Sequence, residues 1–391
     1  MANLFSSLKI RDVTLPNRLA LTPLCMYSAE EGKPTDWLFA HLSTFARGKV
    51  GLIFTEATAV EARGRITSEC LGIWTDEQAE LMKPTIAFIK SQGCIPGIQL
   101  AHAGRKASCY PPFHPTKKGQ PRSVEDGAWE VFGPSPIACD PKTFPVPTEL
   151  SLEEIGKVKQ AYVDAARRAI AVGFQVIEVH MAHGYLLHSF LSPLSNHRSD
   201  QYGGKDSFEN RCAFPLEVTK AIRDVIGGGT PLFVRLSAID AIEGGWTIED
   251  SVAFSKKLKE VGVDVIDCSS GGICNRPRFV MTDDGQKLTA ESARAPGFQV
   301  PLANKVKNEA EILSMCVGVI TDPHHAEQIL AEKKADIVAI GRELMYNPFW
   351  LLHAAQELGV LDENFSLWPK QYAWAVNRQN QIKRYNAEQK M

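Results

Sequence analysis

Two histidines and a tyrosine lie close together at the start of residues 180–204, HMAHGYLLHSFLSPLSNHRSDQYGG. His180 and His183 are three residues apart, Tyr185 comes two residues later, and the apolar stretch QVIEV precedes them. Two imidazoles can each donate a hydrogen bond to one oxygen, and a phenol can deliver a proton. This chemistry suits hydride addition to a conjugated carbonyl, because the histidines would hold the enolate oxygen while Tyr185 protonates the neighbouring carbon.

Spacing alone leaves two other interpretations of these histidines open. The HxxH pair could belong to a metal site, although it lacks the glutamate of an HExxH motif and no further carboxylate is suitably placed. The histidines could also be structural residues whose hydrogen bonds are satisfied inside the protein.

Other polar side chains also follow apolar runs that we interpret as strands. They are Cys25 and Tyr27 in TPLCMYSA, and Gln99, His102, Arg105 and Lys106 in IQLAHAGRKA. A single cysteine would ordinarily pack as a small hydrophobic residue, so its position after a strand is what draws attention to it.

Arg235 lies inside the apolar run FVRLSA, where a buried guanidinium needs a negative partner. Gly318, Gly341 and Arg342 lie near the last two predicted strands. In an α/β barrel, the loops after strands seven and eight commonly bind phosphate, because glycines allow backbone N–H groups to approach and arginine adds charge. No GxGxxG or Walker motif is present, which disfavours a Rossmann or P-loop nucleotide site.

Eight short apolar runs alternate with helical patterns, which predicts a single (β/α)₈ TIM barrel of the α/β class. The predicted strands are residues 19–21, 51–55, 95–100, 175–180, 231–236, 264–268, 316–320 and 336–340. The predicted helices are residues 40–47, 76–91, 151–172, 207–226, 247–261, 302–313, 323–332 and 349–357. Two long irregular stretches, 103–150 and 271–299, should form loops over the carboxyl end of the barrel, where barrel active sites lie.

Composition narrows the class of protein. Of 391 residues, 44% are hydrophobic, and 45 acidic residues nearly balance 43 basic ones. We therefore expect no nucleic-acid partner, no membrane span and no signal peptide. The nine cysteines are scattered without a CxxC pair, which predicts neither a disulfide framework nor a thiolate zinc site and indicates a cytoplasmic protein.

Together these segments resemble the Old Yellow Enzyme family, the FMN-dependent ene-reductases among the NADH:flavin oxidoreductases. The resemblance runs almost end to end, through LPNRLALTPLCMYSA, LGIWTDEQ, GIQLAHAGRK, the His180 segment, FVRLSA, IDCSSGG and IGRELMYNPFW. The Cys25-Met26-Tyr27 arrangement resembles the thermophilic-like subgroup, and the long loops resemble its fungal members. The resemblance implies noncovalently bound FMN, with NADPH or NADH as the hydride donor.

The resemblance also implies a role for each matching residue. His180 and His183 would bind the substrate oxygen, Tyr185 would donate the proton, and Tyr27 and Lys106 would lie on the substrate side. Cys25 would tune the flavin potential, and Arg235 would stabilise charge on the reduced ring. The residues expected to bind FMN are Pro23, Leu24, Cys25, Ala57, Gln99, Arg235, Ser270, Gly318, Gly341 and Arg342.

The C-terminal residues depart from the family pattern. The chain is expected to be one FMN-binding domain, 1–391, with 368–391 as an extension. Relatives of the thermophilic-like subgroup place an arginine from this region in a neighbouring subunit's active site, but Trp374 stands at that position here, and Arg378 is an alternative. A homodimer or homotetramer is expected.

The sequence thus predicts NAD(P)H-driven reduction of an activated alkene (an enone, enal, maleimide or nitroalkene) by ping-pong hydride transfer from flavin N5. An FMN enzyme with one dedicated biosynthetic substrate, as a reductase or an isomerase, is the alternative within the family. A metal-dependent barrel hydrolase and a flavin-binding protein without turnover are the alternatives outside it.

Overall fold

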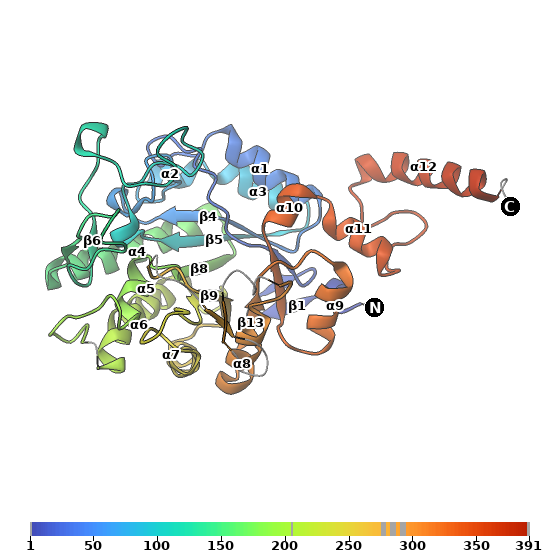
Figure 1. The fold of residues 1–391 in the computed structure, drawn as a ribbon. Coiled ribbons are helices and arrows are strands. Elements are labelled where there is room, and N and C mark those ends of the chain that lie inside the picture. The colour runs from blue at the N-terminus through green and yellow to red at the C-terminus, as the bar shows by residue number, and fades with distance from the viewer. Residues whose placement is uncertain (1, 205, 275–278, 282–286, 290–294, 389–391) are drawn as a thin grey trace.

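Eight parallel strands close into a barrel in the order β3-β4-β5-β8-β9-β10-β13-β14, and β14 pairs with β3 (Figure 1). The computed structural model describes residues 2–204, 206–274, 279–281, 287–289 and 295–388. The strands are β3 (Leu19–Leu21), β4 (Leu52–Ala59), β5 (Ile95–Ala101), β8 (Val176–Met181), β9 (Leu232–Ser237), β10 (Val265–Ser269), β13 (Leu313–Cys316) and β14 (Ile337–Ile340). The predicted TIM barrel is confirmed.

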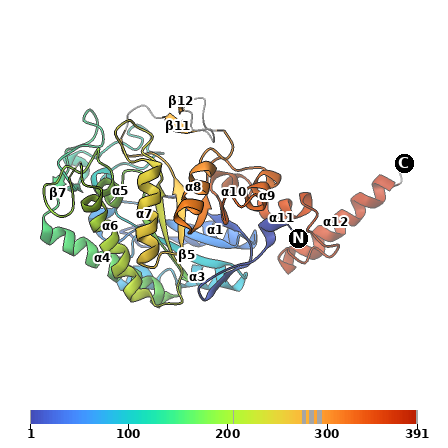
Figure 2. The ribbon, with the colours of Figure 1, turned by 90° about the horizontal axis from the view of Figure 1, so that it is seen from below.

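Helices cover the outside of the barrel (Figure 2). They are α1 (Asp36–Arg47), α2 (Asp76–Glu80), α3 (Lys83–Ser91), α4 (Leu152–Val172), α5 (Leu186–Leu191), α6 (Phe208–Ile226), α7 (Ile248–Glu260), α8 (Val300–Ala310), α9 (Pro323–Ala331), α10 (Arg342–Tyr346) and α11 (Trp350–Glu357). The side chains of Ser151, Thr247 and Asp322 cap α4, α7 and α9 by accepting backbone N–H groups at the starts of these helices.

Several predicted boundaries differ by a few residues from those observed, and two predicted elements were wrong. The seventh strand ends at Cys316 instead of beginning there, because Gly318 and Val319 take positive φ values of 137° and 52° and leave the extended conformation. The predicted helix 76–91 is two helices, α2 and α3. Pro84 lies in the first turn of α3, and it lacks the N–H that a continuous helix would need there.

The barrel interior changes character from one end to the other. At the amino end, the hairpin of β1 (Leu8–Ile10) and β2 (Val13–Leu15) packs its Ile10 and Leu15 into a cluster of buried apolar side chains. Phe54 and Phe233 meet edge to face in this cluster, with ring centroids 5.9 Å apart. At the carboxyl end, polar and charged side chains line the interior, so this end of the barrel can hold an active site.

The two long loops and the C-terminus lie outside this core. The 103–150 stretch contains two-residue strands β6 (Phe132–Gly133) and β7 (Thr148–Glu149). Of the predicted 271–299 loop, β11 (Phe279–Met281) and β12 (Lys287–Thr289) form a hairpin, and residues 275–278, 282–286 and 290–294 lie outside the described residues. Helix α12 (Lys370–Glu388) extends away from the barrel in both views (Figures 1 and 2). Within the described part of the chain, no helix is long and apolar enough to cross a membrane.

Candidate active site

His180 and His183 come together at the carboxyl end of β8. His180 Nε2 and His183 Nδ1 are 3.4 Å apart, and the two rings are nearly perpendicular at 82°. The Ala182 N–H donates to His180 Nδ1 at 3.1 Å, so a neutral His180 carries its hydrogen on Nε2. The Ser269 hydroxyl lies 2.7 Å from His183 Nε2, and the His183 tautomer decides which of the two donates. With its hydrogen on Nδ1, His183 can donate toward the same place as His180 Nε2, so a substrate oxygen between the two rings can accept from both.

Electrostatics keep both imidazoles neutral. Burial lowers the pKa of His180 and of His183 well below the usual value, and the nearby positive charge of Arg235 lowers both further. Neutral imidazoles suit an oxyanion that forms only during the reaction, since they donate hydrogen bonds without carrying a full charge into a buried site.

Tyr185 lies beside this pair and remains a phenol. Its ring meets the His180 ring edge to face, with centroids 5.0 Å apart. Burial raises the pKa of Tyr185 well above its usual value, so the hydroxyl keeps the proton that the proposed chemistry needs. Burial likewise raises the pKa values of the Cys25 thiol and the Tyr27 hydroxyl, so both are protonated near neutral pH.

The backbone turn between His180 and Tyr185 is held on several sides. His183 has a left-handed φ of 60°, and its N–H donates to Ser237 Oγ at 2.9 Å. The Lys106 ammonium donates to the carbonyl oxygens of His183 and Gly272 at 2.8 and 2.7 Å. Lys106, predicted to lie on the substrate side, thus ties the turn 182–185 to the segment after β10.

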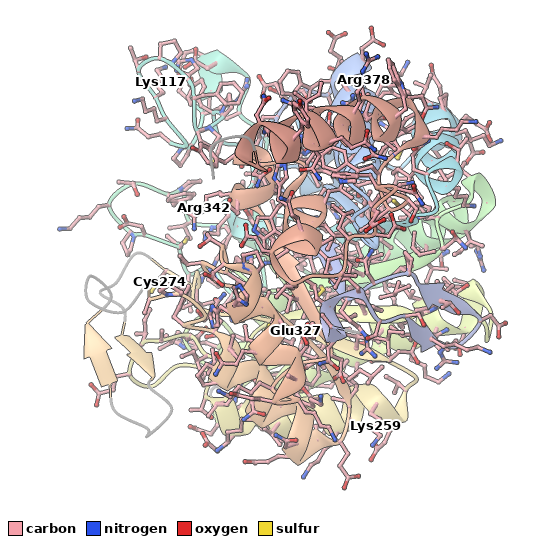
Figure 3. The ribbon with its side chains drawn as sticks, turned by 90° about the vertical axis from the view of Figure 1, so that its right-hand side faces the viewer. Lys117, Lys259, Cys274, Glu327, Arg342 and Arg378 are labelled. Carbon is pink, nitrogen blue, oxygen red and sulfur yellow. The ribbon has the colours of Figure 1, made fainter. Side chains whose placement is uncertain are left out.

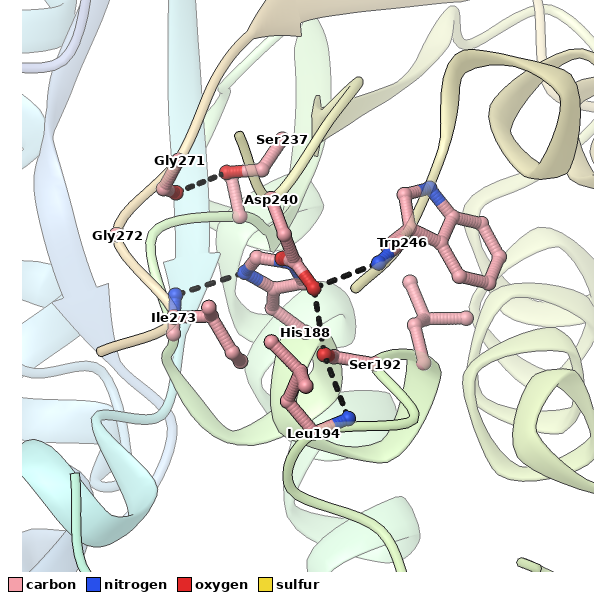
Figure 4. A network of polar contacts seen from close by, with 12 residues as sticks. His188, Ser192, Leu194, Ser237, Asp240, Trp246, Gly271, Gly272 and Ile273 are labelled. Carbon is pink, nitrogen blue, oxygen red and sulfur yellow. Dashed lines mark hydrogen bonds and ion pairs between the residues drawn. The ribbon is translucent and has the colours of Figure 1, made fainter. Parts of the chain in front are cut away.

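A buried network holds the next residue of the turn (Figure 4). The Gly184 N–H donates to His188 Nδ1 at 2.8 Å, and His188 Nε2 lies 2.9 Å from Asp240 Oδ1. The other Asp240 oxygen, Oδ2, accepts from the Ser192 hydroxyl at 2.6 Å and from the backbone N–H of Trp246 at 2.7 Å. His188 and Asp240 are 1% and 0% exposed, so this network is part of the interior.

A cavity of about 530 Å³ opens at the mouth of the barrel next to the histidines. It extends from Arg235, inside the barrel, to Arg342 at the start of α10, and Ser269 in its wall contacts His183. Figure 3 shows Arg342 and Cys274 on the same side of the molecule. Predicted residues that line it are Leu24, Arg235, Gly318, Gly341 and Arg342; further lining residues include Thr22, Ser269, Phe298, Gln299 and Tyr346.

The remaining predicted FMN ligands do not line this cavity. The Ser270 hydroxyl donates to Gln299 Oε1 at 2.7 Å, and Gln299 is a lining residue. Gln99 is buried inside the barrel, where its Nε2 donates to Glu178 at 2.8 Å. Cys25 and Pro23 lie in the half-buried segment after β3, and Ala57 lies on β4.

Two buried carboxyl groups were missed by the sequence reasoning. Arg235 Nε lies 3.0 Å from Asp267 Oδ2 on the neighbouring strand β10, so the partner expected for the buried arginine is a protein side chain. Glu178 lies on β8, two residues before His180. The signal was available, because an acidic residue inside the apolar runs QVIEV and VIDCS needs a partner as much as Arg235 does.

Comparison with known proteins agrees with this geometry. The model of the NADH:flavin oxidoreductase / NADH oxidase family matches residues 3–360. The chain is 44% identical to the NADPH dehydrogenases of Geobacillus sp. (strain WCH70) and Bacillus subtilis (strain 168), over 91% of this chain and 94% and 95% of theirs.

Solved structures give the same result. Morphinone reductase is 25% identical, with a TM-score of 0.71 over 92% of this chain and 90% of its own. Morphinone reductase in complex with tetrahydroNAD is 26% identical, with a TM-score of 0.68 over 91% of each chain. The chain therefore belongs to the NADH:flavin oxidoreductase / NADH oxidase family, in its Old Yellow Enzyme branch, and is an NAD(P)H-dependent FMN oxidoreductase.

Proposed function

We propose that this protein reduces the carbon–carbon double bond of activated alkenes, namely enones, enals, maleimides and nitroalkenes, in a ping-pong cycle. FMN, when bound, supplies the hydride that it has received from NADPH or NADH. The protein's own groups would hold the substrate oxygen and deliver the proton. The observation that carries the proposal is the pair of neutral imidazoles, whose facing nitrogens lie 3.4 Å apart beside a protonated tyrosine.

The residues around the cavity fit FMN. A Cβ on Gly341 would come within 2.9 Å of Thr22 Cγ2, and one on Gly318 within 3.1 Å of Phe298, so glycine keeps backbone accessible at this end. Arg342 adds positive charge there, which suits a phosphate. At the other end, Arg235 lines the cavity and brings positive charge to it, which suits the electron-rich ring of a reduced flavin. Cys25 would tune the cofactor's potential as a neutral thiol.

During the reaction, His180 and His183 would each donate a hydrogen bond to the carbonyl or nitro oxygen of the substrate, whose negative charge grows as hydride arrives. Tyr185 would then protonate the α-carbon from its place beside His180. Tyr27 would contribute a further hydroxyl on the substrate side of the flavin. Because all of these groups are neutral, the developing charge meets prearranged dipoles and needs no rearrangement of buried ions.

The test is His180→Ala and His183→Ala, with the exposed His353→Ala as a matched control. Each active-site variant should bind a phenol, which mimics an enolate, more weakly and should lose about 2–4 kcal/mol of transition-state stabilisation in alkene reduction. Phenol titration and stopped-flow measurement of the alkene half-reaction check this. Unchanged phenol affinity together with unchanged alkene reduction would overturn the assignment.

We further propose a cytoplasmic homodimer or homotetramer built from one domain, residues 1–391, with 368–391 as the oligomerising extension. The support is α12, on which Trp374 is 68% exposed and Tyr385 is 62% exposed. Arg378 lies on α12, away from Arg342 at the cavity of its own chain (Figure 3). In the proposed oligomer, either Trp374 or Arg378 would reach the active site of a neighbouring subunit. Sedimentation of the full chain and of the Trp374→Ala variant tests this, and a monomeric wild type would contradict it.

A further inference from the structure

Four polar side chains form a buried layer inside the barrel, between the apolar amino end and the cavity. Gln99, Glu178, Arg235 and Asp267 come from the neighbouring strands β5, β8, β9 and β10. Gln99 is opposite Glu178 in the ladder, and Arg235 is opposite Asp267. Glu178 and Asp267 are both 0% exposed. Burying two carboxyl groups is costly unless each is paired or protonated.

The layer holds one positive charge for two carboxyl groups. Arg235 Nε lies 3.0 Å from Asp267 Oδ2, which makes Asp267 its counter-ion. Glu178 Oε1 accepts from the neutral amide of Gln99 at 2.8 Å, and its Oε2 is without a hydrogen bond among the described residues. Geometry thus assigns the arginine to Asp267 and leaves Glu178 with an amide that cannot offset a charge.

Protonation follows from this arrangement. Burial raises the pKa of Glu178 well above its usual value, and the negative charge of Asp267 raises it further, against the opposing effects of Arg235 and Gln99. Burial also raises the pKa of Asp267, but Arg235 opposes that shift from 3.0 Å away. Since only Asp267 has a cation beside it, Glu178 is the carboxyl group assigned the proton and Asp267 the one assigned the charge.

We propose that Asp267 sets the redox potential of the bound FMN by offsetting the charge of Arg235, whereas Glu178 is an uncharged positioning residue that orients the Gln99 amide. This inference rests on the proposed placement of FMN in the cavity that Arg235 lines. Positive charge near the flavin stabilises the reduced, more negative form. A carboxylate beside Arg235 weakens that effect and keeps the potential lower.

Two isosteric substitutions separate the roles. Asp267→Asn removes the counter-ion, so the ratio of reduced to oxidised FMN at a fixed potential should rise at least about tenfold, which is about 30 mV for a two-electron couple. Glu178→Gln keeps an acceptor for Gln99 and removes no charge, so the potential should stay near the wild-type value. Glu178→Gln is the matched control, because it alters the same buried layer by the same chemical change.

Potentials are measured by anaerobic titration against reference dyes in the holoenzyme. The infrared spectrum of the wild type should also contain the carbonyl band of a protonated carboxylic acid, shifted in D₂O and lost in Glu178→Gln. Absence of that band, or a rise in potential in Glu178→Gln equal to that in Asp267→Asn, would overturn the proposal. An unchanged potential in a folded, FMN-bound Asp267→Asn protein would also overturn it.

Failure of a variant to fold and failure of the wild type to bind FMN are interpreted separately. If Asp267→Asn does not fold, Glu178→Gln and its infrared spectrum still decide which carboxyl carries the proton, and a charged Glu178 would refute the inference. If the wild type does not bind FMN, the proposed placement fails first. A wild type that binds FMN and reduces alkenes, but whose two variants behave alike, would refute the role of Asp267 alone.

Discussion

The turn 182–185 and the helix α12 differ in how many contacts hold them to the rest of the chain. Backbone groups of the turn bond to Lys106, His188 and Ser237, side chains from three different segments of the chain. Helix α12 is anchored only near its start, where Arg47 donates to the Tyr372 hydroxyl and Phe349 stacks on the nearby Trp368. From residue 373 onward, no described side chain of α12 hydrogen-bonds to the barrel.

The turn carries side chains whose positions must be accurate, whereas α12 exposes side chains that the proposed oligomer would cover. A misplacement of about 1 Å at a catalytic group can cost about a hundredfold in rate, so the turn is fixed from several directions. Trp374, Ile382 and Tyr385 of α12 are each more than half exposed, as the proposed burial against a second copy requires. Each of the following changes tests one side of this contrast, from the largest expected effect to the smallest.

Tyr185→Phe should slow the alkene half-reaction by about 10²- to 10⁴-fold for poorly activated enones, because general acid catalysis is lost. Flavin reduction by NADPH should stay nearly intact, since that step requires no proton at the substrate carbon. Tyr385→Phe, on the exposed face of α12, is the matched control and should be silent. Stopped-flow measurement of both half-reactions decides: equal slowing of both means a damaged flavin site, and an unaffected alkene step makes water or Tyr27 the donor.

Gly184→Ala should lower the free energy of unfolding by about 3 kcal/mol, through backbone strain and overpacking. Gly184 has a φ of 75°, and a Cβ there would lie 2.3 Å from the Gly272 carbonyl oxygen. Gly359→Ala has a similar φ of 67° but open space around its Cβ, so it should cost only about 1 kcal/mol. Urea unfolding compares the two variants. Equal losses of unfolding free energy would show that the atoms around Gly184 move to accommodate the added methyl group.

Acid should destabilise the turn through its histidines. The pKa of folded His183 is lowered by burial, so below the ordinary value of 6.5 the unfolded chain binds a proton that the folded protein does not. Stability therefore falls as pH falls, by up to about 1.4 kcal/mol per pH unit for each such histidine. His183→Asn should flatten the fall by that amount between about pH 6 and about pH 5, whereas the exposed His353→Asn should not. Parallel curves for all three proteins would contradict this.

Trp374→Ala should change the unfolding free energy of the single chain by no more than about 0.5 kcal/mol, the usual range for surface substitutions. The indole is 68% exposed, and its N–H donates to the Gln371 carbonyl of its own helix. Unfolding at low protein concentration measures the single-chain effect. A loss of several kcal/mol there would mean that α12 packs on its own barrel.

Much of the fold was predictable because it depends on local patterns. Alternating apolar runs and helical patterns predicted the barrel, its helices and seven of its eight strands in place. The seventh strand was misplaced because Val317-Gly318-Val319-Ile320 is as apolar as a strand, but its backbone turns to line the cavity. Apolar composition does not distinguish a buried strand from a buried loop.

The candidate site was less predictable, since its contacts join distant parts of the sequence. Lys106 lies 77 residues from His183 and 166 from Gly272, and nothing in its own segment indicates that its ammonium binds backbone carbonyls. The Arg235–Asp267 pair could have been found, because both charges interrupt apolar strands. Its geometry required the barrel register, which only closure of the sheet provides.

The bonds from Lys106 and Arg105 have a consequence for how the loops at the carboxyl end of the barrel can move. Arg105 donates to the Ile273 carbonyl at 2.7 Å, and Lys106 donates to the Gly272 carbonyl at 2.7 Å. The backbone at residues 272–273 is therefore pinned next to the turn 182–185 by two adjacent cations. A shift of either loop would pull on the other, because the same short segment holds both. The position of the turn is thus set jointly by loops that follow three different strands of the barrel.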